Sequence, residues 1–187
     1  MTLTELVQEV LDWTNRPDLE AQARSSIRRT TLSLHRTHAF WRDIQSFTFT
    51  PGLASFGTIL LSSPSAPRFR GFQSVTDNKL RLVDPDDLYD LDGYQRTDCI
   101  WAAGSAINWR STAGNYPITV NYFQDPDIAT ATFTSWIADL QPDAIITSAV
   151  ASLMSLKGED SIRQRAAQMA QEEVAALITN HSTAVLR

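Results

Sequence analysis

The chain has 187 residues, of which 43% are hydrophobic and 20% are charged, and its formal net charge is −5. These values are typical of one globular domain, or of one domain that carries a smaller lobe. Lysine and arginine show no surplus, which argues against binding of nucleic acid through its phosphates, because counterion release supplies most of that affinity.

The N-terminal residues 1–43 predict a helical hairpin. Thr2 and Glu5 fit a capping box, and apolar residues then recur at helical spacing over residues 4–13. A break at residues 15–18 precedes a second helix, expected over residues 19–38. Glu5 and Glu9 stand where a secretory leader would need apolar residues, so we expect a soluble protein made in the cytoplasm.

Residues 44–128 change from helical to alternating periodicity, which predicts an inserted β-rich lobe. Asp84-Pro85 is typical of a helix start and predicts a short helix over residues 85–91. Turns are expected at residues 77–78, 104–105 and 114–115. The last three strands should form an antiparallel meander. The expected strands cover residues 44–50, 58–61, 69–75, 79–83, 99–103, 106–110 and 118–123.

Residues 129–181 predict a second helical hairpin, and residues 182–187 a loose tail. Its helices are expected over residues 141–156 and 159–180, with Pro142 early in the first and Lys157-Gly158 between the two. No apolar run approaches the roughly 20 residues that cross a bilayer. The predicted fold class is therefore α+β, a four-helix bundle made of N- and C-terminal helical hairpins with an inserted antiparallel β lobe.

Aspartates form the densest charge cluster. A calcium loop starting at Asp84 would need an oxygen ligand at its fifth position and glycine at its sixth, where the sequence has Leu88 and Tyr89. A capped helix with a solvated surface explains the cluster better. Its members are Asp84, Asp86, Asp87, Asp90, Asp92 and Asp98.

His35 and His38 are three residues apart on a predicted helix, a spacing at which two imidazoles can share a zinc ion. Structural zinc needs four ligands, and the other soft candidates are Cys99 and the distant His181. Side-chain packing, or an interaction with the helix C-terminus, explains both histidines better. No metal and no other cofactor is therefore predicted. As the single cysteine, Cys99 also excludes an internal disulfide.

No residue pattern supports an enzyme. Asp125 and Asp127 bracket Pro126, which is a turn signature, and no Gly-x-Ser-x-Gly elbow or Ser/His/Asp spacing is apparent. A hydrolase that uses a carboxylate pair within residues 84–98 is the weakest hypothesis.

A carbohydrate- or single-strand-binding module is the alternative function, because aromatic and basic residues interleave in the middle of the chain. Strands with one face in the core explain the same pattern better. The residues are Arg68, Phe69, Arg70, Phe72, Trp101 and Trp109.

Four short patterns at the ends and in the middle of the chain resemble the head-to-tail adaptor proteins of tailed bacteriophages. One is the break Thr14-Asn15-Arg16-Pro17-Asp18, and another is the Trp136-Ile137-Ala138-Asp139 entry to the C-terminal hairpin. The helix–Lys157-Gly158–helix ending and residues 83–89, VDPDDLY, add to the resemblance. These are packing and capping patterns rather than a catalytic signature.

The resemblance implies a homo-oligomeric ring, usually a dodecamer, beneath the portal protein in the neck of the virion. Such a ring extends the DNA channel, helps retain packaged DNA, and offers an attachment platform to the downstream tail or nozzle protein. Double-stranded DNA would pass through without specific binding, which suits a chain with no basic stripe. The resemblance also implies portal docking by the C-terminal residues Val185, Leu186 and Arg187, and it transfers no catalytic residue.

Overall fold

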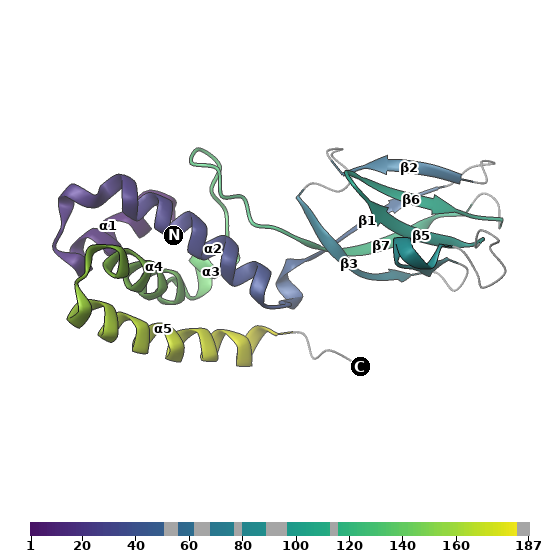
Figure 1. Ribbon diagram of the computed structural model, residues 1–187. Helices are drawn as coiled ribbons and strands as arrows, with labels where there is room; N and C mark the ends of the chain where they lie inside the picture. Colours follow the sequence, from purple (N-terminus) through teal and green to yellow (C-terminus); the bar gives the residue numbers. More distant parts are fainter. Residues whose placement is uncertain (51–55, 62–67, 77–79, 89–96, 113–115, 183–187) are drawn as a thin grey trace. The chain divides into compact units, whose positions relative to one another are not determined.

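A computed structural model describes residues 1–50, 56–61, 68–76, 80–88, 97–112 and 116–182 of the chain (Figure 1). The chain divides into two compact units. Met1–Asp43 and Asp125–Arg187 make up the first, called here the helical unit, and Ile44–Gln124 make up the second, the β unit. The chain is thus α+β, with the two ends of the sequence in one unit and the middle in the other.

Up to residue 182, the helical unit contains five α-helices and two short 3₁₀ turns, Pro17–Leu19 and Trp41–Asp43. The four predicted long helices are confirmed, and each end lies within one residue of the expected one. The five-residue α3 was not predicted. The helices are α1 (Leu3–Thr14), α2 (Glu20–Thr37), α3 (Trp136–Leu140), α4 (Pro142–Lys157) and α5 (Asp160–His181).

Helix α4 forms the centre of the helical unit. It packs against α1, α2, α3 and α5, and no residue from Ala144 to Met154 is exposed. Helix α5 packs chiefly along α4, and among its 22 residues only Ala166 and Leu177 are buried. The predicted four-helix bundle is therefore not confirmed, because α5 packs chiefly against one helix, α4 (Figure 1).

Local signals explain where the helices begin and end. Thr2 and Glu5 form both halves of the predicted capping box at the start of α1. Helix α4 ends at Gly158, whose φ of 73° is the left-handed conformation that side chains disfavour. None of the helices in the described part of the chain has the length and hydropathy needed to cross a membrane.

The described residues of the β unit form two sheets, with strand orders β1-β7-β3 and β2-β6-β5-β4. A 3₁₀ turn, Pro85–Asp87, stands where a longer helix was expected, and residues 89–91 of that prediction lie outside the described residues. The turns expected at 77–78 and 114–115 also lie outside them. The strands are β1 (Ile44–Phe49), β2 (Phe56–Leu60), β3 (Phe69–Thr76), β4 (Arg81–Leu82), β5 (Cys99–Ala103), β6 (Ala106–Arg110) and β7 (Ile118–Gln124).

The prediction of an antiparallel β5-β6-β7 meander is wrong. Strands β5 and β6 form the expected hairpin, but β7 lies between β1 and β3 in the other sheet. Strand β6 already pairs with β2 on one side and β5 on the other, so it has no free edge for β7. The lobe is also not wholly antiparallel, because the short β4 pairs parallel with β5.

The core of the β unit is rich in rings and β-branched side chains. Trp109 is 6% exposed and lies against the backbone of Gly57, where an added Cβ would come within 2.4 Å of the indole. Gly57 therefore makes room for the largest side chain of this core. The buried members are Phe47, Leu80, Ile100, Ile107, Trp109, Ile118, Val120 and Tyr122.

Candidate docking surface

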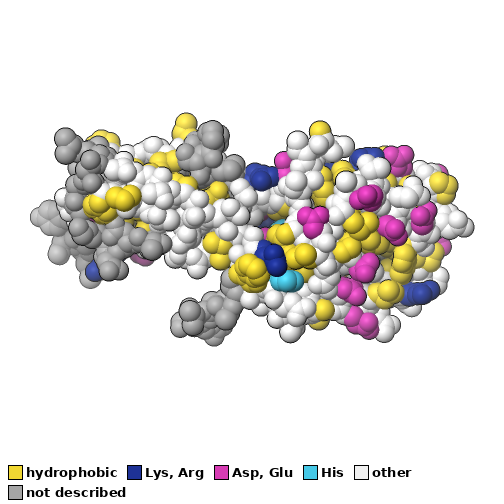
Figure 2. Space-filling view, turned by 180° about the vertical axis from the view of Figure 1, so that it is seen from behind, with side chains coloured by type: hydrophobic (Ala, Val, Ile, Leu, Met, Phe, Trp, Pro, Cys, Tyr) yellow, Lys and Arg dark blue, Asp and Glu magenta, His cyan; other side chains and the backbone are white. Residues whose placement is uncertain are grey.

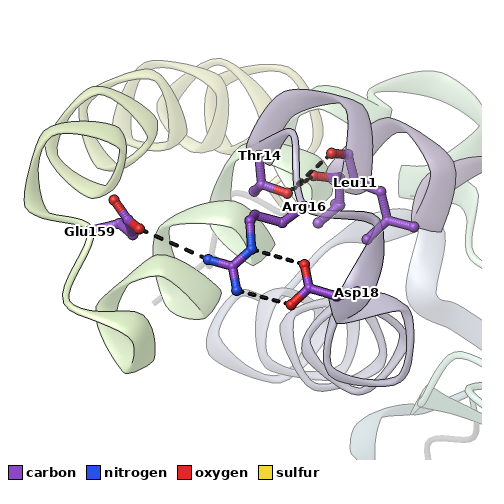
Figure 3. A network of polar contacts seen from close by, with 6 residues as sticks. Leu11, Thr14, Arg16, Asp18 and Glu159 are labelled. Carbon is purple, nitrogen blue, oxygen red and sulfur yellow. Dashed lines mark hydrogen bonds and ion pairs between the residues drawn. The ribbon is translucent and has the colours of Figure 1, made fainter.

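The two interhelical turns noted in the sequence, residues 15–18 and 157–158, lie at the same end of the helical unit, called here the turn end (Figure 3). Arg16 connects them. Its Nε and Nη2 donate to the two carboxylate oxygens of Asp18 at 2.9 Å each, and its Nη1 lies 3.9 Å from Glu159 Oε1. The hydrogen bond to Asp18 raises the pKa of Arg16 and lowers the pKa of Asp18.

The Thr14–Asp18 pattern is explained locally by the end of helix α1. Thr14 Oγ1 donates to the carbonyl oxygens of Val10 and Leu11, at 2.9 and 3.2 Å. Asn15 takes the left-handed conformation, with φ of 51°, and its N–H donates to Asp12 O. These contacts shape the turn, and they leave Arg16 and its partners on an exposed surface (Figure 3).

A groove of about 430 Å³ lies at the turn end, between the last turn of α1 and the first turns of α5. Trp13, Ser161, Ile162 and Arg165 line it. The Arg165 guanidinium lies 5.6 Å from the centre of the Trp13 ring, which is a cation–π contact. Within the described residues no carboxylate lies at ion-pair distance from Arg165. The groove thus offers an aromatic wall, a hydroxyl and an available positive charge.

Tryptophan and arginine are the residue types that most often dominate binding at protein interfaces. Trp13 and Ile162 pack on the core of the helical unit with one side, so the groove has a firm base. Leu156, in the last turn of α4, is 76% exposed at the same end of the unit. This combination suits a protein segment that carries apolar and acidic side chains, rather than a small-molecule reaction.

The structure also assembles a chain of hydrogen bonds that the sequence did not reveal. His35 Nδ1 lies 2.7 Å from Asp43 Oδ1, and its Nε2 lies 3.0 Å from Ser135 Oγ. Trp136 Nε1 donates to the same Asp43 oxygen at 2.7 Å. The Ser, His and Asp are 7%, 1% and 4% exposed, which leaves a substrate almost no access to the serine oxygen. We interpret these hydrogen bonds as structural: they hold the end of α2 against the start of α3.

The two histidines noted in the sequence have different surroundings. His35 is buried in that hydrogen-bonded chain, whereas His38 is half-buried beside Phe40. Across the described ranges, no three His, Cys, Asp or Glu side chains are grouped to hold a metal ion.

The aspartates noted in the sequence have separate surroundings. Asp98 accepts from Thr112 N and Oγ1, and Asp125 binds Arg36 through both carboxylate oxygens. The hydrogen bond to Asp125 raises the pKa of Arg36. Asp127 accepts from the N–H of Ala129, as in a turn. Asp84, Asp86 and Asp87 are exposed around the 3₁₀ turn, and Asp90 and Asp92 lie outside the described residues.

The aromatic residues of the β unit are mainly core residues. Trp109 is buried, and Phe69 and Phe72 pack partly on the same core. Trp101 is half-buried and lies in one cross-strand row with Asn108 and Thr58. Phe56, which was not among the predicted residues, is 69% exposed on the same face of the sheet as Trp101. The expected portal-docking residues Val185, Leu186 and Arg187 lie outside the described residues.

A comparison with curated proteins found no match. A comparison with protein families matched residues 1–185, nearly the full length of the chain, to the family described as SU10 adaptor protein. The match includes both units and the turn end described above. The chain therefore belongs to the SU10 adaptor protein family, whose members are adaptor proteins of bacteriophages.

Proposed function

We propose that the protein is a structural head-to-tail adaptor, forming a ring beneath the portal protein that extends the DNA channel, helps retain packaged DNA and provides the platform for tail attachment. The family match over residues 1–185 is the observation that carries this proposal. The location that follows is the neck of the virion, between the capsid portal and the tail.

The surface of the helical unit supports a role in assembly. A ring needs two different patches on each copy, because one face of a subunit meets another face of the next. Helix α5 leaves most of its 22 residues exposed, and the turn end presents a separate groove. In Figure 2 hydrophobic side chains are interspersed with acidic ones over the helical unit. Such a surface can bind proteins at several places.

The charge balance supports a channel that DNA passes through without being held. The chain has 16 basic and 21 acidic side chains. A wall without a surplus of lysine and arginine releases few counterions to phosphates, so it binds DNA weakly. In this proposal double-stranded DNA passes through the channel without specific binding. The specific partners are the portal and a downstream tail or nozzle protein.

Purified portal rings provide the test. The protein mixed with its cognate portal should co-sediment with it, and electron cryo-microscopy of the complex should show a ring of adaptor copies, twelve in our proposal. An absence of portal binding across a range of ionic strengths would contradict the function as a whole. A ring of another size would contradict only the copy number.

The C-terminal residues enter the proposal as portal contacts. A chain shortened by residues 183–187 should bind portal rings more weakly while its helical unit unfolds at the same temperature. Changing Val185 and Leu186 to serine in the full-length chain separates loss of apolar contact from loss of length. Unchanged portal affinity in both variants would remove the C-terminal contact and leave the adaptor function standing.

A further inference from the structure

We propose that the groove formed by Trp13, Ser161, Ile162 and Arg165 receives the acidic turn Asp84–Asp87 of a neighbouring copy of the chain. This inference rests on the proposed ring, and it assigns two specific patches to the contact between adjacent copies. The groove lies in the helical unit and the turn in the β unit, so the contact joins different surfaces, as a ring requires.

The groove recognises negative charge next to apolar groups. The guanidinium of Arg165 lies over the Trp13 ring and has no acidic partner within the described residues, so its N–H donors remain available to a carboxylate. Ile162 and Trp13 supply apolar walls, and the Ser161 hydroxyl can donate or accept a hydrogen bond. A volume of about 430 Å³ falls within the roughly 300–1,000 Å³ of typical binding pockets.

The acidic turn has the complementary composition. Asp84, Asp86 and Asp87 are all exposed around the 3₁₀ turn Pro85–Asp87, and none of them forms an ion pair with another described residue. Leu82, just before the turn, is 45% exposed. The turn therefore presents exposed carboxylates beside an apolar side chain, in a short structured segment that loses little conformational entropy on docking.

Charge makes a second copy a suitable occupant. Copies with a net charge of −5 repel one another at long range, so adjacent copies need contacts in which opposite charges meet. Contact between Arg165 of one copy and the aspartates of the turn of the next is one such attractive contact. It uses a cation and carboxylates that form no ion pair with one another or with any other described residue of a single copy.

Charge reversal tests this contact in the full-length chain, with ring formation on portal measured by sedimentation and electron microscopy. Arg165→Glu should weaken association between copies by about tenfold or more, and Asp86→Lys with Asp87→Lys should do the same. An equimolar mixture of the two variant proteins should restore association. In an alternating ring each reversed groove then meets a reversed turn, and each native groove meets a native turn.

A single chain that carries all three changes should also assemble, which a merely misfolded variant could not do. Arg163→Glu is the matched control, because Arg163 is on the same helix but is paired with Asp160 and does not line the groove. It should leave association unchanged.

Three results would overturn the inference. One is unchanged association in both reversed variants, and another is a mixture that fails to assemble. The third is an Arg165→Glu variant that loses portal binding while its copies still associate, since the groove would then belong to the portal. In each case wild-type rings on portal would still form, so the adaptor function would survive. If wild-type chain forms no ring, the function and the inference fall together.

Discussion

The helical unit and the β unit build their cores in different ways. In the helical unit one apolar helix, α4, contacts the four others, so most core contacts pass through a single continuous segment. In the β unit the core is closed between two small sheets, and its buried rings come from strands far apart in the chain. We therefore expect the two units to unfold separately, and substitutions in one to leave the other unchanged.

The largest effect is expected from Asp43→Ala, at the end of the helical unit. The change removes the acceptor shared by the buried His35 Nδ1–H and the half-buried Trp136 Nε1–H, and a buried donor that loses its acceptor costs about 1–3 kcal/mol. Hydrogen exchange measured by mass spectrometry should show faster opening of α2 and α3. Asp160→Ala removes an ion pair whose carboxylate side chain is 72% exposed, and it is the control. Equal stability of the two variants would contradict a structural role for the hydrogen bonds that connect Ser135, His35, Asp43 and Trp136.

Leu153→Ala should come next, with a loss of about 2–5 kcal/mol in the free energy of unfolding of the helical unit. Leu153 is 1% exposed in the C-terminal half of α4 and belongs to the core of the helical unit, so the change leaves a cavity there. Leu156→Ala, three residues later and 76% exposed, should change stability by no more than about 0.5 kcal/mol. Denaturant unfolding followed by circular dichroism measures both. Similar losses of stability in the two variants would contradict the role of the buried face of α4 as the centre of the helical core.

Gly57→Ala probes the β unit, with an expected loss of about 1–3 kcal/mol from overpacking. The new Cβ would lie 2.4 Å from Trp109 Cζ2, and the buried indole would have to shift. Gly71→Ala, in the other sheet, meets nothing within 4 Å and should be tolerated. Hydrogen exchange in β2 and β6 should rise in the first variant only, with α4 unchanged. Faster exchange in α4 would contradict the independence of the two units.

The smallest effect is expected at the turn end, where Arg16 lowers the pKa of the exposed Asp18. A lowered folded-state pKa stabilises the fold above the unfolded value of about 3.9, and this stability is lost as the pH falls through the folded pKa. Asp18→Asn should therefore be slightly less stable than wild type at neutral pH and equal to it in strong acid. Glu159→Gln, 3.9 Å from Arg16, is the weaker-contact control. If Asp18→Asn remained less stable than wild type in strong acid, the lowered pKa of Asp18 could not be the cause of the stability difference.

The units also differ in how far the sequence predicts them. Helix starts and ends depend on nearby residues, so Thr2, Pro17 and Gly158 were sufficient to place the long helices. Helix α3 has five residues, too few to show a helical period. Strand pairing depends on distant partners, and alternation in β7 shows that Ile118, Val120 and Tyr122 are buried without showing which strands lie beside it.

The candidate surface was predictable only in part. The Asn15–Asp18 and Lys157-Gly158 turns are visible in the sequence, because glycine, proline and asparagine mark helix ends. That Trp13 and Arg165 share a groove follows from the packing of α1 beside α4 and of α5 along α4, which no local signal reveals. Asp43 and Ser135 meet at His35 for the same reason, across 100 residues of sequence in the case of the serine.

The pairing of β1 with β7 has a consequence for how the chain can be rearranged. Ile44 and Phe123 are register partners in neighbouring antiparallel strands, so the two ends of the β unit lie only about 5 Å apart. Because its two ends are so close, this segment can be removed and the remaining chain joined with a linker of a few residues. It can likewise be exchanged or moved to another protein. The 81 central residues, Ile44–Gln124, thus form an insertion that could be replaced by another folded segment without changing the connections of the helical unit.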